Sequence, residues 1–273
     1  DGYSLGMKAL AVNLSDIAAM GGTPRFFLVS LGLPPHLPLQ FVDDFYRGLM
    51  IRAEEFDVRL AGGDTNASPR QLVIDLTVVG EMLPDRLVRR SGARGGDSIW
   101  VTGTLGDAAL GLSLLRRERH RLPLTDFTSL AMRHLSPRPR VREGRMLADH
   151  KIASSMIDIS DGLLADLSRV LAASGRGATV SLTDLPLSKD FVRCTVPGDE
   201  RKIDYALSGG EDYELLFTVA QGREEELLRL AGGFSVPVTR IGEITDTGNL
   251  AVLDVERRPY DIARLGYDHF SSP

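Results

Sequence analysis

The feature that most restricts how this chain folds is residues 5–20, a segment that is apolar on nearly every side and carries the acid Asp16. A helix that is apolar all round has to be buried, and Gly21-Gly22 followed by Pro24 is a typical helix end. Burying an ionised carboxylate is costly unless a cation or strong donors compensate it. We therefore expect a buried helix whose acid meets a cation, with Asn13 on the same stripe orienting the carboxylate. The alternative is a buried aspartate satisfied by an arginine or by backbone amides.

The rest of the chain mixes strand and helix patterns. Apolar runs bounded by turn residues predict strands at residues 26–31, 58–61, 72–79, 98–101, 153–157, 178–182, 213–219, 236–241 and 250–255. Apolar residues at helical spacing predict further helices at residues 38–56, 107–117, 127–135, 140–148, 161–174 and 224–230. Because strands and helices do not alternate strictly, the order indicates an α+β fold in which helices cover one face of each mixed sheet.

A polar, arginine-rich connection at residues 84–96 divides this pattern in two. With 273 residues and 43% hydrophobic content, the chain has enough apolar side chains for one large or two modest cores. We place a domain boundary in the connection and predict two domains, residues 1–90 and 91–273.

Composition excludes several classes of protein. A net charge of −5 argues against a general nucleic-acid binder. The arginine-dense stretch 116–145 is expected to be a solvated helical surface and a loop, with a phosphate- or nucleic-acid-binding patch as the alternative. No apolar run approaches the roughly 20 residues that span a bilayer. The single cysteine, Cys194, excludes an internal disulfide and a multi-cysteine metal site; it fits a reducing cytoplasm and is expected to fill space.

Four segments place acids beside glycine or small polar residues at the edge of an apolar element. They are Asn13-Leu14-Ser15-Asp16, Gly62-Gly63-Asp64-Thr65, Asp158-Ile159-Ser160-Asp161-Gly162 and Gly209-Gly210-Glu211-Asp212. Asp64 follows two glycines after a predicted strand, and glycine lets the backbone approach a ligand closely. A plain turn with a side-chain cap is the alternative reading of that segment.

The pair Asp158 and Asp161 lies across a predicted strand-to-helix turn, with Ser160 expected to cap the helix. Carboxylates there can face one cavity and bind a hard divalent ion such as Mg²⁺ together with substrate phosphates. The sequence has no cluster of histidines or cysteines of the kind that binds zinc. The sequence also lacks a G-x-x-x-x-G-K-[ST] loop and the protein-kinase signatures. The acids and glycines together favour phosphoryl transfer that relies on metal cations and positioning.

Taken in order, these segments resemble the motifs of the thiamine-monophosphate kinase family. The resemblance runs through residues 8–21 (KALAVNLSDIAAMG), 62–65 (GGDT), 90–93 (RSGA), 96–97 (GD), 101–103 (VTG), 156–163 (MIDISDGL), 207–215 (LSGGEDYEL) and 266–270 (GYDHF). It covers essentially the whole chain. It implies a two-domain α+β fold of the aminoimidazole-ribonucleotide-synthetase type and a cytoplasmic homodimer. In that fold residues 1–90 bind ATP and Mg²⁺ and form the dimer, and residues 91–273 complete the nucleotide and substrate site.

The reaction that the resemblance implies is direct in-line transfer of a phosphoryl group from ATP to thiamine monophosphate, which yields thiamine diphosphate, with several Mg²⁺ ions. By motif position, the implied metal ligands are Asp16, Asp64, Asp158 and Asp161, and the first three of these have the catalytic role. The implied ATP contacts are Tyr46, Gly63, Asp64, Arg90 and Ser160. The implied substrate contacts are Glu211 and Tyr267. The guanidinium of Arg90 offers a fork of donors to phosphate oxygens, and Tyr267 offers a ring for stacking on thiamine.

Three alternatives stay open beside this interpretation. Selenophosphate synthetase and aminoimidazole ribonucleotide synthetase belong to the same superfamily, although the second is expected to have glutamate at Gly63-Asp64 and glycines at Ser160-Asp161. A non-catalytic nucleotide-binding regulator is the third, and the acids kept in all four segments argue against it. The family pattern also begins with a segment that carries further metal-binding acids and a substrate-binding histidine, and this sequence starts after it. That segment is either disordered without ligand or removed.

Overall fold

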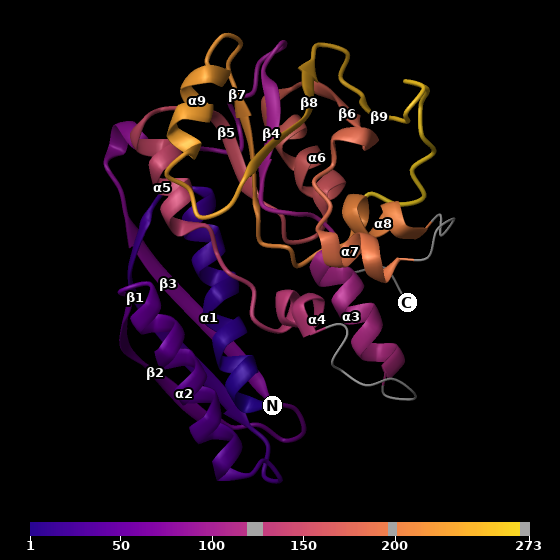
Figure 1. The fold of residues 1–273 in the computed structure, drawn as a ribbon. Helices are drawn as coiled ribbons and strands as arrows, with labels where there is room; N and C mark the ends of the chain where they lie inside the picture. The colour runs from indigo at the N-terminus through magenta and orange to yellow at the C-terminus, as the bar shows by residue number, and fades with distance from the viewer. Residues whose placement is uncertain (119–127, 196–200, 268–273) are drawn as a thin grey trace.

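The computed structural model describes residues 1–118, 128–195 and 201–267, which form two mixed sheets and the helices around them (Figure 1). The elements are α1 (Gly2–Ala19), β1 (Thr23–Leu33), α2 (Leu39–Glu55), β2 (Arg59–Ala67), β3 (Val73–Glu81), β4 (Ser98–Thr102), α3 (Asp107–Glu118), α4 (Thr128–Leu135), α5 (Val141–Asp149), β5 (Ala153–Asp158), α6 (Leu163–Ser174), β6 (Gly177–Ser181), α7 (Lys189–Cys194), α8 (Arg201–Ser208), β7 (Leu215–Val219), α9 (Glu224–Ala231), β8 (Val238–Thr245) and β9 (Leu250–Leu253). The α+β fold predicted from the sequence is confirmed.

The N-terminal sheet has the strand order β2-β1-β3, with β2 parallel and β3 antiparallel to the central strand. Side chains on β1 alternate, because successive residues of a strand point to opposite faces. Phe27 and Val29 point into the core formed with α1 and α2, whereas Phe26 and Leu28 are exposed on the other face. The two helices therefore cover one face of this sheet, as the sequence predicted.

The C-terminal sheet has the strand order β5-β7-β4-β8-β6-β9, and β6 and β9 form its parallel pair. Its central strand β4 is buried on both sides. Ile99 and Val101 pack in the cluster that contains α6, while Trp100 packs in the cluster that contains residues of α5 and α9. The prediction that helices cover one face of each sheet is therefore wrong for this sheet, since helices lie on both faces (Figure 1).

Helix α1 connects the two sheets. It packs along α2 in the N-terminal half, and its C-terminal end also contacts α5 and β5. Ala18 and Ala19 near that end belong to the same buried cluster as Met156 of β5. The end of α1 is thus held against the C-terminal sheet at the strand that ends in Asp158.

Several sequence predictions about individual elements need correction. Gly62-Gly63-Asp64-Thr65 does not follow a strand but lies inside β2. Ser160 does not cap α6, whose N-cap is Gly162 with a φ of 120°. Helices α7 and α8 were missed because they are short, six and eight residues long. Gly175 ends α6 in the left-handed conformation, as predicted.

The N-terminal sheet ends at Glu81 and the C-terminal sheet begins at Ser98, so the connection between them includes the predicted boundary. The exact division into residues 1–90 and 91–273 stays a prediction. Across the described ranges, no helix is both long and apolar enough to span a membrane. Cys194 is partly buried and packs beside Phe191 and Leu130, which agrees with a space-filling role.

Candidate active site

The candidate site begins where the C-terminal end of α1 meets the last residue of β5. The Ser15 hydroxyl donates a hydrogen bond of 2.7 Å to Oδ2 of Asp158, and both side chains are buried. Burial raises the pKa of Asp158 to about 6; the Ser15 hydrogen bond opposes this shift, and the negative charges of Asp16 and Asp166 add to it. No arginine or lysine among the described residues forms an ion pair with Asp158. This is a buried carboxylate without a cation of its own.

Asp16 follows Ser15 on the same helix but differs from the sequence prediction. The helix is buried along Leu10, Leu14 and Ala18, whereas Asp16 itself is exposed at the edge of the packed region. The surrounding chain still raises the pKa of its carboxyl by desolvation, and the charge of Arg90 opposes that rise. Asn13 does not orient this acid, because its amide donates to the carbonyl of Ala9 in the preceding turn of α1.

The turn from β5 into α6 is held by an acid that the sequence analysis did not select. Asp166 in the first turn of α6 accepts hydrogen bonds from the backbone amides of Ser160, at 2.9 Å, and Asp161, at 3.0 Å. Burial raises the pKa of Asp166, and the backbone hydrogen bond from Asp161 opposes that rise. Asp161 in turn forms an ion pair of 2.5 Å with Arg169. Of the predicted metal ligands, Asp161 already has an arginine partner.

Residues 209–214 interlock with this turn through the backbone. The amide of Glu211 donates to the carbonyl of Ser160 (2.8 Å), and the amide of Tyr213 donates to that of Ile159 (2.9 Å). A Cβ atom at Gly210 would lie 2.5 Å from the Ser160 carbonyl oxygen, so the close approach of the two segments requires glycine there. Two of the four acid-containing segments therefore form one substructure.

Glu211 is bound by two basic side chains from other elements. Lys8 of α1 and His134 of α4 each place a nitrogen 2.8 Å from its carboxylate. Burial alone would raise the pKa of Glu211, but His134 and Lys8 outweigh it and lower that pKa to about 2. The predicted substrate contact is thus an ionised carboxylate held between the N-terminal and C-terminal halves of the chain.

Acids from three of the four acid-containing segments act electrostatically on the side chain of Tyr213. Burial raises the pKa of this phenol, and the negative charges of Glu211, Asp158, Asp16 and Asp161 raise it further, in that order. These acids come from α1, the end of β5, the turn before α6 and the loop before β7. We call the group Asp16, Asp158, Asp161 and Glu211 the acid cluster.

The fourth segment lies elsewhere in the described structure. Asp64 is exposed on the edge strand β2, where its carboxylate accepts hydrogen bonds from the Thr65 amide (2.9 Å) and the Asn66 side chain (2.7 Å). A Cβ atom at Gly63 would lie 1.8 Å from the carbonyl oxygen of Val29, so this glycine admits the neighbouring strand. No contact among the described residues joins Asp64 to the acid cluster.

The remaining predicted site residues differ in how closely they approach the acid cluster. Arg90 is exposed and its charge acts on Asp16. Tyr267 is 62% exposed, and its amide donates to the Asp161 carbonyl, which brings the C-terminal motif against the turn. Tyr46 packs edge-on against Phe45 in the N-terminal core. The last residues of the motif, 268–270, lie outside the described residues.

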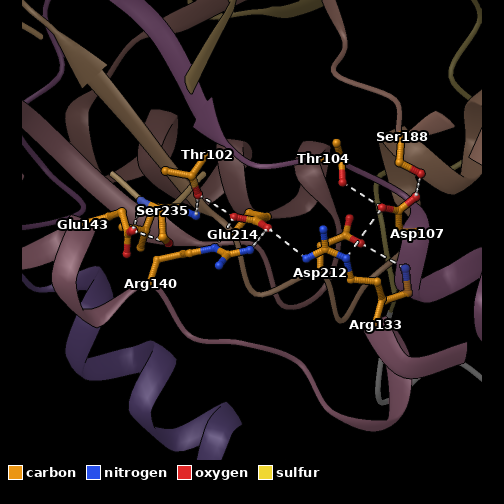
Figure 2. A network of polar contacts seen from close by, with 12 residues as sticks. Thr102, Thr104, Asp107, Arg133, Arg140, Glu143, Ser188, Asp212, Glu214 and Ser235 are labelled. Carbon is orange, nitrogen blue, oxygen red and sulfur yellow. Dashed lines mark hydrogen bonds and ion pairs between the residues drawn. The ribbon is translucent and has the colours of Figure 1, made fainter. Parts of the chain in front are cut away.

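A buried polar network holds residues 209–214, the loop before β7, in place (Figure 2). Glu214 is 1% exposed and accepts hydrogen bonds from the Thr102 hydroxyl and the Arg140 guanidinium, each at 2.7 Å. Asp212 accepts the amides of Gly106 (2.7 Å) and Ala108 (3.3 Å) at the start of α3. The residues on both sides of Tyr213 are therefore fixed by the C-terminal half of the chain.

Arg140 corrects the prediction for the arginine-dense stretch 116–145. It is 3% exposed and paired with Glu214, so this arginine is structural rather than solvated. Arg133 lies 3.9 Å from Asp107 and 3.8 Å from Glu214 in the same network. Residues 119–127 of the stretch lie outside the described residues.

The donor set of the acid cluster suits a hard divalent cation. Carboxylate oxygens are the ligands that Mg²⁺ prefers, and Asp158 is a buried carboxylate without a cationic partner in the described chain. In the parts of the chain that are described, however, no three histidine, cysteine, aspartate or glutamate side chains are close enough to enclose a metal ion. The arrangement therefore fits Mg²⁺ held partly by phosphate oxygens and water, as is usual for that ion.

Ser15, Asp166, Lys8, His134 and Tyr213 were not selected from the sequence. Asp166 offered a signal, because it is an acid between the apolar positions Leu163 and Leu167 of a helix. The partners of Ser15 and Lys8 lie far away in the sequence, and spacing gives no signal for such contacts.

Comparison with known proteins identifies the domains and the family of this chain. Residues 1–82 match the AIR synthase related protein N-terminal domain, and residues 94–255 match the corresponding C-terminal domain. The chain is 41% identical over 274 residues to thiamine-monophosphate kinase of Escherichia coli O157:H7, covering 100% of this chain and 82% of the relative.

Solved structures show the same likeness. The crystal structure of thiamine-monophosphate kinase from Stenotrophomonas maltophilia K279a is 39% identical with a TM-score of 0.85, over 92% of this chain and 78% of that one. A structure described as AaThiL complexed with AMPPCP and TMP is 34% identical with a TM-score of 0.86, over 98% of this chain and 81% of that one. The chain thus belongs to the thiamine-monophosphate kinase family and is built from the two AIR synthase related domains.

Proposed function

We propose that this protein transfers a phosphoryl group from ATP to thiamine monophosphate, with Mg²⁺, and so produces thiamine diphosphate and ADP. The observation that carries the proposal is that α1, the turn after β5 and the loop before β7, which bear Asp16, Asp158, Asp161 and Glu211, are joined by direct contacts between the two halves of the chain. Family membership and the AaThiL complex with AMPPCP and TMP support the choice of substrates.

The residues of the acid cluster have separate tasks in this proposal. When bound, Mg²⁺ would supply positive charge that offsets the negative charge of the phosphates. Asp16 and Asp158 would hold it, with Asp64 and Asp161 as further ligands. Asp158 suits this task above a pH of about 6, where its carboxyl is ionised. Below that pH the carboxyl is protonated and attracts a cation less.

The remaining predicted contacts bind and orient the substrates. Arg90 is exposed beside Asp16 and offers guanidinium donors to the nucleotide phosphates. Gly63, Ser160 and Tyr46 stay proposed ATP contacts from motif position. Glu211, ionised and anchored by Lys8 and His134, and the exposed ring of Tyr267 would bind thiamine monophosphate. Because the attacking phosphate oxygen is already anionic, no protein base has to remove a proton from it.

We also propose that the protein works as a homodimer in the cytoplasm. The uncovered face of the N-terminal sheet exposes Phe26 and Leu28 on β1 and Val79 on β3. An apolar sheet face of this kind is typical of a surface that another subunit covers. Sedimentation or light scattering of the purified protein tests this part, and a monomer at micromolar concentration would contradict it.

The direct test of the activity is to incubate the full-length protein with ATP and thiamine monophosphate and to separate the products. We expect thiamine diphosphate and ADP in equal amounts when Mg²⁺ is present, and neither product when the metal is chelated. Formation of ADP without thiamine diphosphate would contradict the proposed acceptor. Binding of the nucleotide without any turnover would favour the non-catalytic regulator.

A further inference from the structure

Tyr213 lies within the acid cluster, although none of the tasks described above belongs to it. Its backbone has a φ of 51°, and that of Glu211 has a φ of 72°. Residues other than glycine adopt such angles at a cost, which the surrounding structure has to offset. Here the two backbone hydrogen bonds from residues 211 and 213 to the turn after β5 hold the loop in this conformation.

The backbone on both sides of Tyr213 is held in place. The preceding residue, Asp212, is bound to backbone amides at the start of α3, and the following residue, Glu214, is bound to Arg140 in the buried network of Figure 2. The ring itself is only partly buried. This backbone, together with the hydrogen bond from the Tyr213 amide to the Ile159 carbonyl, holds residue 213 against the turn that carries Asp158 and Asp161.

The chemistry of that hydroxyl differs from the chemistry of its neighbours. Ionised carboxylates only accept hydrogen bonds, whereas a phenol also donates one. A phenol is protonated at neutral pH, so the Tyr213 hydroxyl is a neutral donor in a group of acceptors. Within the described residues, this hydroxyl makes no hydrogen bond. A donor that is preorganised beside metal-binding acids and has no protein partner suits an anionic ligand.

We propose that the Tyr213 hydroxyl donates a hydrogen bond to a phosphate oxygen of the substrate bound at the acid cluster. The inference rests on the proposed kinase function and adds a residue to it. Such a donor favours the phosphate group without adding positive charge that would compete with Mg²⁺ for the carboxylates. The competing explanation is that the aromatic ring merely fills space beside the loop.

Three variants separate these explanations. Tyr213→Phe removes only the hydroxyl, and Tyr213→Leu also removes the ring. Tyr205→Phe is the matched control, because the Tyr205 hydroxyl bonds to Ser113 at 2.9 Å in the packing between α8 and α3, outside the acid cluster. We would measure kcat and KM for each substrate, thermal unfolding, and the Kd of AMPPCP with Mg²⁺ by calorimetry.

A donor role predicts that Tyr213→Phe and Tyr213→Leu both lower kcat/KM, by about ten- to hundredfold, the range expected when a hydrogen bond to a charged group is lost. Tyr205→Phe should keep the wild-type value. A rise in the Kd of AMPPCP would assign the bond to the nucleotide, and a rise in KM for thiamine monophosphate alone would assign it to the acceptor. A fall in kcat alone would assign it to the phosphoryl group in transfer.

Wild-type kinetic constants and an unchanged AMPPCP affinity in folded Tyr213→Phe would overturn the inference and leave the ring with a packing role. Failure of the kinase proposal looks different, because then the wild-type protein itself forms no thiamine diphosphate. In that event the calorimetric comparison of wild type with Tyr213→Phe still decides the inference, and equal Kd values reject it.

Discussion

The hydroxyl of Ser15 lies 2.7 Å from the carboxylate of Asp158, a hydrogen bond between residues that are 143 positions apart. Ser15 belongs to the helix that packs on the N-terminal sheet, and Asp158 ends the edge strand of the C-terminal sheet. This buried contact joins the two halves of the chain at the place where the acids gather. The position of Asp158 in the site therefore depends on how the halves pack together.

Asp158→Asn should stabilise the protein without Mg²⁺ while it abolishes turnover. The folded-state pKa of Asp158 is raised from 3.8 to about 6 by burial. The protonated Asp158 carboxyl therefore contributes to the free energy of unfolding of the protein. This contribution is fully present below pH 3.8 and is lost as the pH rises through about 6. Asparagine keeps an acceptor for Ser15 but carries no charge. At pH 7.5 its gain in unfolding free energy should reach at most about 3 kcal/mol, since one pKa unit is worth about 1.4 kcal/mol.

Denaturant unfolding of the metal-free proteins at pH 4 and 7.5 measures this difference. Asp43→Asn, which changes an exposed acid on α2, is the control and should match the wild type at both values. A variant that is less stable than the wild type at pH 7.5 would show that Asp158 is not a strained buried charge.

Lys8→Met should raise the KM for thiamine monophosphate by about three- to tenfold, less than the loss of a direct hydrogen bond to a charged group, because Lys8 acts on the substrate only through Glu211. Lys8 and His134 hold Glu211 and lower its pKa to about 2, so Glu211 stays ionised at every pH used for assays. Without Lys8, one of the two anchors is lost and the carboxylate is positioned less well. Steady-state kinetics with each substrate varied in turn test this, with exposed Arg229→Met as the control. An equal rise in the KM for ATP would contradict the proposal that Glu211 binds thiamine monophosphate.

Asp64→Asn should abolish turnover and leave folding intact. The side chain is exposed on β2 and bonds only locally, so we expect a change in unfolding free energy of less than about 0.5 kcal/mol. Loss of a metal ligand should instead raise the Mg²⁺ concentration needed for activity beyond the usable range. Rates measured against Mg²⁺ concentration test this, and a near-normal rate would exclude Asp64 from the mechanism.

Much of the fold could be predicted from local patterns. Strand and helix positions followed from apolar spacing, because burial imposes a period on each element. The end of α6 at Gly175 followed from the conformational freedom of glycine. Short helices such as α8 were missed, since so few turns show little periodicity and their stability comes from tertiary packing that spacing does not report.

The site was harder to predict because its acids are held by distant partners. Asp16 was expected to be buried, but the edge of the packed region leaves it exposed. Ser160 was taken as a helix cap, whereas the amides of the turn bond to Asp166 instead. Gly63 stays a predicted nucleotide contact, and the structure adds a separate reason for glycine there, the close approach of strand β1. The exposure of Asp16 and the packing at Gly63 depend on other elements, which spacing along the chain does not show, whereas the Asp166 contacts are local to the turn.

Arg140→Met tests whether the buried network holds the active-site loop. Arg140 and Glu214 are both almost fully buried, and removing one partner of such a pair leaves an uncompensated charge that costs about 3–5 kcal/mol. We expect a loss of that size in unfolding free energy. Because Glu214 follows Tyr213 directly, turnover by the fraction that remains folded should also fall.

The double variant Arg140→Met, Glu214→Leu tests whether the loss of stability in Arg140→Met comes from the unpaired charge of Glu214 or from the lost packing of the arginine side chain. It replaces the ion pair with apolar side chains, and the unfolding free energy should return most of the way to the wild-type value, since an apolar replacement of a buried pair is often neutral. Arg229→Met, which breaks an exposed pair with Glu225, should change stability by less than about 1 kcal/mol. If Arg140→Met were as stable as this control, the network of Figure 2 would not be what fixes the loop before β7.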